Sequence, residues 1–158
     1  MIISFWNGAT TDMYSSTRLV GNGNPHHNYF HKQVSLTRQC VGKTCSLGPH
    51  ETNRYSFRFS ADKKPAQWIP GDFPVTPKYS TGGGINCTAA ANHQLCVWIK
   101  VAHTAYTVQD WAKKECGSGS PKPIGKPYVI KSPNKNNEGG SYYCVIGTCR
   151  EKGDGYWE

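Results

Sequence analysis

The sequence predicts an all-β domain, mainly antiparallel, folded as a compact β-barrel or sandwich with at most one or two short helices and stapled by disulfides. Several short segments alternate between apolar and polar residues, the pattern of strands with one buried face. Glycine and proline contribute 17 and 10 of the 158 residues, which indicates many turns. Seven cysteines in so short a chain are typical of a disulfide-bonded protein from an oxidising compartment.

The length and composition fit one globular domain. A chain of 158 residues can bury its own core, and a hydrophobic content of 37% argues against disorder. We expect residues 1–158 to be a single mature domain, because the start of the chain lacks the basic lead and the cleavage site of a signal peptide. No stretch approaches the roughly 20 apolar residues of a membrane helix, so we expect no membrane insertion.

The longest apolar and β-branched run extends from Leu95 to Gly117. Apolar residues alternate with others through 95–101, which predicts a buried strand that bends near His103. Thr107 precedes Asp110 by three residues, and the apolar residues that follow recur at helical spacing. We therefore expect a helix of about two turns that ends at Gly117, although a second strand also fits this pattern.

Other segments fit strands and turns around this centre. In RYSFRFS at 54–60, Tyr55, Phe57 and Phe59 share one face, and residues 33–40 alternate more weakly. The first 31 residues read as a strand followed by loops, and 117–127 reads as a loop. We expect four segments to belong to one antiparallel sheet or barrel, with 134–140 as the turn between the last two: 54–60, 95–101, 128–131 and 141–146.

The cysteines predict three disulfides and one remaining thiol. CVGKTC at 40–45 and CVIGTC at 144–149 have the spacing of hairpins closed by a local bridge, although the two loops could also pair with each other. We slightly favour the local pairs, and Cys87 with Cys96 as a further bridge. The candidates are Cys40, Cys45, Cys87, Cys96, Cys116, Cys144 and Cys149.

The formal charge of +8 makes nucleic acid, an acidic polysaccharide or an acidic protein possible partners, but the charges are spread thinly along the chain. The histidines at 26, 27 and 31 lack the intervening glutamate of a zinc-protease helix, so they read as loop residues, and we expect no metal and no cofactor. A hydrolase of the ribonuclease type would need histidine and glutamate in one cleft. The candidates for that role are His50, Glu51, His93 and His103.

A binding role is best predicted for the proline-rich excursion from Lys63 to Gly84. Loops carry binding function more often than core strands do, and its prolines lower the entropy lost when the loop becomes ordered. The excursion contains apolar anchors of the kind found at interface hot spots, with Lys63, Lys64 and Lys78 as a basic rim. These anchors, which could instead fold back over the barrel end, are Trp68, Ile69, Phe73 and Tyr79.

The chain as a whole resembles secreted necrotrophic effectors, the host-selective protein toxins of fungal wheat pathogens. The resemblance rests on the start WNGATTDMYSS at 6–16, on the cysteine spacing and on CVWIKVAHTAYTVQDW at 96–111. It implies a signal peptide, a pro-segment removed by a Kex2-type protease, and secretion into the host apoplast. It also implies a β-barrel-like disulfide-bonded fold.

The same resemblance implies a virulence function without catalysis. Such a protein triggers cell death in sensitive plants through recognition by host proteins, including pathogenesis-related proteins of the PR-1 class. We expect a monomer that is not an enzyme and binds no nucleic acid. The rival hypotheses are a secreted ribonuclease-like hydrolase and a carbohydrate-binding module that uses exposed aromatic residues such as Trp68.

Overall fold

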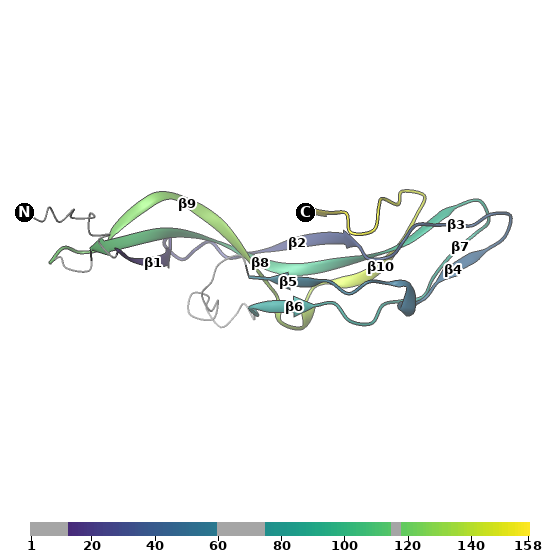
Figure 1. The fold of residues 1–158 in the computed structure, drawn as a ribbon, viewed down its shortest axis with the longest axis horizontal. Helices are drawn as coiled ribbons and strands as arrows, with labels where there is room; N and C mark the ends of the chain where they lie inside the picture. Colours follow the sequence, from purple (N-terminus) through teal and green to yellow (C-terminus); the bar gives the residue numbers. More distant parts are fainter. Residues whose placement is uncertain (1–12, 60–74, 115–117) are drawn as a thin grey trace, which may run out of the picture.

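The computed structural model describes residues 13–59, 75–114 and 118–158, and these form an all-β, antiparallel protein without an α-helix (Figure 1). The predicted fold class is therefore confirmed. The described residues include two short 3-10 helices, η1 (Pro49–Glu51) and η3 (Lys135–Asn137). The described strands are β1 (Met13–Leu19), β2 (His26–Gln33), β3 (Arg38–Gln39), β4 (Cys45–Leu47), β5 (Ser56–Arg58), β6 (Lys78–Ser80), β7 (Cys87–Ala89), β8 (Gln94–Lys114), β9 (Lys122–Pro133), β10 (Ser141–Ile146) and β11 (Gly155–Trp157).

Strand β8 is the centre of the fold and runs through most of the long axis in Figure 1. Along one edge it pairs with β1, β2 and β3, and along the other with β9 and β10. All of these pairs are antiparallel, and β11 adds to the outer edge of β2. The resulting seven-stranded sheet curls into an open half-barrel.

Between β1 and β2, and again between β9 and β10, the row of strands beside β8 is interrupted, but the chain stays bonded to β8 at both places. Between β1 and β2, the carbonyl of Gly23 accepts from the Thr107 N–H at 2.7 Å. Between β9 and β10, the side chain of Asn137 takes the place of a strand backbone. Its Oδ1 accepts from the Ala102 N–H at 2.7 Å, and its Nδ2 donates to the Lys100 carbonyl at 3.1 Å. Both flanks are thereby kept in register.

The helix expected from Thr107 to Gly117 is wrong, because β8 continues as a strand to Lys114. The segment 108–114 pairs residue by residue with β1, and the stretch 103–112 pairs with β9 on the other edge. Two partner strands satisfy the backbone of a segment whose short helical pattern carries little free energy of its own. Residues 115–117 lie outside the described residues.

Several predicted boundaries also need correction. The predicted strand 54–60 is reduced to β5, which pairs with β6 in a separate two-stranded sheet instead of the main one. Of the weak strand predicted at 33–40, only Gln33, at the end of β2, and the two residues of β3 are in strands. The histidines at 26, 27 and 31, expected in a loop, lie on β2. Strand β9 begins inside the expected loop 117–127. The segment 134–140 is not a hairpin turn, since β9 and β10 lie one after the other along β8.

The core lies on the face of the sheet that bears Val97, Ile99 and Val101, all fully buried. The small β5–β6 sheet packs against this cluster through Phe57 and Tyr79. Tyr55, just before β5, packs there as well. A second cluster forms around Tyr106, where Phe59 packs. The inward face predicted for Tyr55, Phe57 and Phe59 is therefore confirmed.

Three disulfides are present: Cys40–Cys45, Cys87–Cys144 and Cys96–Cys149. The local pair Cys40–Cys45 was expected, whereas the local pair Cys144–Cys149 and the pair Cys87–Cys96 are wrong. The register explains both errors, because Val145 and not Cys144 lies opposite Cys96. Neighbouring residues of a strand point to opposite faces, so Cys144 reaches β7 while Cys96 bonds the chain beyond β10. Cys116 lies outside the described residues.

Three disulfides indicate an oxidising compartment. Within the described part of the chain, no helix is long and apolar enough to cross a membrane.

Candidate functional site

The predicted binding loop is only partly described. Trp68, Ile69 and Phe73 lie outside the described residues. Tyr79 is on β6 opposite Phe57 and packs against the core cluster. Burial raises the pKa of the Tyr79 phenol, and the nearby phenol of Tyr142 adds to the effect. In this position Tyr79 helps attach the β5–β6 sheet to the core.

A different aromatic surface forms where the segment after β10 returns to the main sheet. The guanidinium carbon of the exposed Arg150 lies 5.2 Å from the ring centroid of Tyr156 and 5.8 Å from that of Trp98. Together with Tyr143 these side chains line a pocket of about 230 Å³. We call this set, Trp98, Tyr143, Arg150 and Tyr156, the Arg150 platform.

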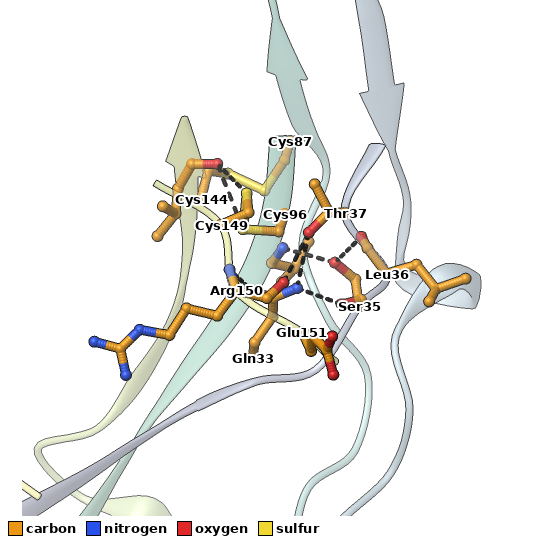
Figure 2. Close-up of a disulfide and its surroundings, with 12 residues drawn as sticks. Gln33, Ser35, Leu36, Thr37, Cys87, Cys96, Cys144, Cys149, Arg150 and Glu151 are labelled. Carbon is orange, nitrogen blue, oxygen red and sulfur yellow. Dashed lines mark hydrogen bonds between the residues drawn. A yellow bond between two sulfur atoms is a disulfide. The ribbon is translucent and has the colours of Figure 1, made fainter. Parts of the chain in front are cut away.

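The backbone of Arg150 is held on both sides. Cys149, the preceding residue, is bonded to Cys96 on β8. The Arg150 N–H donates to Oε1 of the fully buried Gln33 at 2.7 Å, and its carbonyl accepts from the Thr37 hydroxyl at 2.9 Å. Figure 2 shows the Arg150 side chain extending away from this network. A fixed backbone therefore presents a cation whose side chain projects outward.

His31 joins three segments behind this surface. Its Nδ1 lies 2.7 Å from the hydroxyl of Tyr143 on β10, and its Nε2 lies 2.9 Å from the carboxylate of Glu158. Its ring stacks on Tyr156 of β11. The chain Tyr143–His31–Glu158 has the order of an acid–base relay. However, burial, with contributions from Tyr156 and Glu158, raises the pKa of the Tyr143 phenol above its usual value, which opposes its use as a nucleophile near neutral pH.

Close approach of β11 to β2 requires a glycine. A Cβ atom at Gly155 would lie 2.6 Å from the His31 carbonyl oxygen and 2.6 Å from Cζ of Phe30. No real Cβ sits that close to backbone, so a larger residue would push β11 outward. The absent side chain lets Tyr156 and Trp157 settle on opposite faces of the sheet edge, one over His31 and the other near Phe30.

A pocket of about 510 Å³ lies around His103 on the core side of the sheet. Its aromatic walls come from three different strands besides β8: Phe30 from β2, Phe57 from β5 and Trp157 from β11. Arg58 and Lys131 supply cations, and Ser56 and Val129 complete the lining. We call this set the His103 pocket.

The His103 imidazole is held in one tautomer. Its Nδ1 lies 3.0 Å from the Val101 carbonyl oxygen, which can only accept, so the proton is on Nδ1. Burial lowers the pKa of His103; the hydrogen bond to Val101 opposes this shift, and the charge of Lys131 adds to it. The ring is therefore neutral at neutral pH, and its Nε2 is an acceptor.

The four candidates for acid–base catalysis are not brought into one cleft. His50 and Glu51 share a pocket of about 450 Å³ with Arg38 and Lys152, whereas His103 lines the pocket described above. Both carboxylate oxygens of Glu51 already accept hydrogen bonds, one from Arg38 and the other from the Gly48 N–H. His93 lies in a turn, where its Nδ1 contacts the Ala91 carbonyl.

The sequence missed the Arg150 platform because its members are distant in sequence. Trp98 itself is only 3% exposed, so its pattern in the sequence is that of a core residue. One feature of the sequence could have pointed to Arg150: it follows Cys149, and a disulfide at Cys149 fixes the backbone of the next residue. Near the end of the chain, Tyr156 and Trp157 dock back on the fold through their contacts with His31 and His103.

Among the described residues, no group of three or more histidine, cysteine or acidic side chains could hold a metal ion. No protein-family model, curated protein or solved structure gives a significant match to this chain.

Proposed function

We propose that the protein is a secreted virulence effector or toxin that triggers plant cell death through recognition by host proteins, without catalysis of its own. Its setting would be the host apoplast, an oxidising compartment in which the three disulfides persist. The resemblance to necrotrophic effectors in the segments 6–16 and 96–111 supports the same class.

The observation that carries the proposal is the Arg150 platform. Tryptophan, tyrosine and arginine are the residue types that dominate hot spots of protein interfaces, and here the exposed Arg150 and Tyr156 lie against the buried Trp98. Tyr156 is 42% exposed, and Arg150 is exposed as well. The disulfide at Cys149 and the buried Gln33 hold the backbone in place, so little entropy would be lost when a partner binds.

The chemistry of the platform indicates what the partner offers. Among the described residues, no carboxylate forms an ion pair with Arg150. A guanidinium lying on aromatic rings keeps its N–H fork available for a carboxylate. The partner would therefore present an acidic side chain beside an apolar one, and host proteins of the PR-1 class are the first candidates to test for that feature.

The test compares Arg150→Ala with Arg18→Ala. Arg18 is a matched control, since it is also exposed and lies 4.9 Å from the ring centroid of Trp111, but on β1 at the other end of the sheet. Both purified variants are infiltrated into leaves of sensitive and insensitive wheat lines, and their affinity for PR-1 proteins is measured. Arg150→Ala should lose cell-death activity in the sensitive lines and weaken partner binding about 30-fold, the usual scale of a hot-spot residue.

Arg18→Ala should retain both properties, and thermal unfolding should show that both variants fold. Equal loss in the two variants would point to general charge attraction and would contradict the platform. Activity in every plant line tested, independent of genotype, would contradict recognition by a specific host protein.

A secreted hydrolase is the second candidate, since Arg38, His50, Glu51 and Lys152 line one pocket. This combination of cations with histidine and glutamate suits a phosphodiester substrate. His50→Ala and Glu51→Gln test it directly. Loss of both RNA cleavage and cell-death activity in folded variants would favour the hydrolase over the effector proposal. The carbohydrate-binding alternative rests on Trp68, which lies outside the described residues.

A further inference from the structure

The His103 pocket is apolar on its walls and cationic at its polar positions. The rings of Phe30 and Trp157 are 4.9 Å apart between centroids, and those of Phe30 and Phe57 are 5.8 Å apart. His103 meets Trp157 edge-on at 4.8 Å. The edges and faces of several rings thus border one space, an arrangement that favours a further aromatic ring.

The charged residues that the structure describes in this pocket have one sign. Arg58 and Lys131 line it, no acidic side chain is among the described residues of its lining, and Nζ of Lys131 lies 3.8 Å from the Trp157 ring centroid. Low-dielectric walls strengthen the field of such cations inside a cleft. The neutral His103 leaves the positive charge to these two side chains. An anionic group entering the pocket would therefore be attracted, and a cationic one repelled.

The size of the pocket suits a small molecule. Its volume of about 510 Å³ falls within the usual range for ligand sites, roughly 300–1,000 Å³. The walls come from β2, β5, β8, β9 and β11, so the space is formed by the folded sheet as a whole and not by a single loop.

From these features we infer that the His103 pocket binds a small aromatic carboxylate. The ring of the ligand lies among Phe30, Phe57 and Trp157, and its carboxylate accepts hydrogen bonds from Lys131 and Arg58. This site is separate from the Arg150 platform, which draws on Trp98, Tyr143 and Tyr156. The inference therefore does not depend on the proposed host-protein recognition.

The test uses 2-naphthoate and its uncharged counterpart 2-naphthamide as probes, with binding measured by calorimetry on the intact, oxidised protein. Both probes carry the same ring, so the difference between their affinities isolates the carboxylate. Wild-type protein should bind 2-naphthoate at least about tenfold more tightly than 2-naphthamide, a difference of about 1.4 kcal/mol. Salt at about 1 M, where the Debye length is about 3 Å, should reduce this preference.

Variants separate the two halves of the site. Lys131→Gln and Arg58→Gln should each lower the affinity for 2-naphthoate toward that for 2-naphthamide, while 2-naphthamide binding stays unchanged. Phe57→Leu should lower the affinity for both probes, because both carry the ring that Phe57 contacts. Lys126→Gln is the matched control, since Lys126 is exposed on the same strand as Lys131 but does not line the pocket.

The charge-conserving Lys131→Arg should keep the preference for 2-naphthoate over 2-naphthamide. This result would show that the positive charge at residue 131, and not a structural effect of the substitution, causes the preference. Equal affinity of wild-type protein for the two probes would overturn the inference, as would an absence of binding. An equal effect of Lys126→Gln would show attraction by net charge alone and would likewise overturn it.

Discussion

The imidazole of His31 stacks on the phenol ring of Tyr156, with the ring centroids 4.8 Å apart and the planes inclined by only 6°. This contact, together with the hydrogen bonds that His31 forms with Tyr143 and Glu158, fastens β11 to the main sheet. The platform around Arg150 depends on it, because Tyr156 supplies one of the two rings beneath the guanidinium.

His31→Ala should therefore loosen β11 and lower the free energy of unfolding by about 1–3 kcal/mol, the cost of removing a packed ring together with its two hydrogen bonds. His31→Phe retains the stack but not the hydrogen bonds, so its loss should be smaller. Urea unfolding gives the stability, and hydrogen exchange at Gly155 to Trp157 reports the loosening. If both variants protect these amides as wild-type protein does, His31 does not hold β11.

The long-range disulfides should stabilise the fold more than the local one. Cys96–Cys149 spans 53 residues, whereas Cys40–Cys45 spans only 5. On the loop-entropy estimate, replacing the first pair by serines should cost about 4 kcal/mol and the second about 2 kcal/mol. Denaturant unfolding of the two double variants checks the order, and a larger loss for the Cys40–Cys45 variant would contradict it.

Peptide mapping without reduction should recover Cys87 linked to Cys144 and Cys96 linked to Cys149. Titration of the denatured, unreduced protein should find about one thiol, since six of the seven cysteines are paired. A count near seven would contradict the oxidised state and with it the extracellular setting.

His103 should make the fold less stable in mild acid. Its pKa is lowered in the folded protein by burial, so the unfolded chain binds a proton more readily as the pH falls below about 6.5. Stability is then complete above that value and declines as the pH drops toward the folded pKa. Among the described residues, Lys131 from β9 and Arg58 from β5 are the charged groups that line the same pocket, and neither neutralises a protonated ring.

His103→Phe removes the titration and keeps a ring against Trp157. Urea unfolding of both proteins between pH 8 and pH 5 measures the effect. The stability difference between wild-type protein and variant should shift in favour of the variant as the pH falls. A difference that stays constant with pH would mean that His103 does not titrate differently on folding.

The excursion from 63 to 84 remains a second hypothesis for recognition. If it binds the partner, Trp68→Ala and Phe73→Ala should abolish cell-death activity without lowering the thermal midpoint of unfolding, because exposed anchors contribute to binding and not to the core. Loss of both activity and stability would assign these residues to the core. Full retention of both would leave the Arg150 platform as the stronger candidate.

The alternation of apolar and polar residues predicted those strands whose two faces differ most in polarity. The strand 141–146 has the predicted boundaries, and the alternation at 95–101 marks the core face of β8. The same local view failed at Thr107, where pairing with β1 and β9 overrides a helix-like spacing. The pairing register of the strands could not be predicted from the sequence either. It decides the disulfide partners of Cys96 and Cys144, because a shift by one residue moves every side chain to the opposite face.

The candidate sites were harder still to predict. Arg150 and Tyr156 become neighbours of Trp98 only after β10 has paired with β8 and β11 with β2. The sequence did predict the types of residue that would matter, namely exposed aromatic and basic side chains, but it placed them on the proline-rich excursion. His103 was singled out as a candidate base, whereas in the structure it is one wall of an aromatic pocket.

The central place of β8 has a consequence for biosynthesis. Its partner strands lie on both sides of it in the chain, at 13–33 on one side and 122–146 on the other. The main sheet cannot close until β10 has left the ribosome, so an early nascent chain exposes strand edges without their partners. Folding dominated by such distant pairings is slow, and oxidation before closure would trap wrong cysteine pairs. Efficient production should therefore depend on chaperones and disulfide isomerases that act after the whole chain is available.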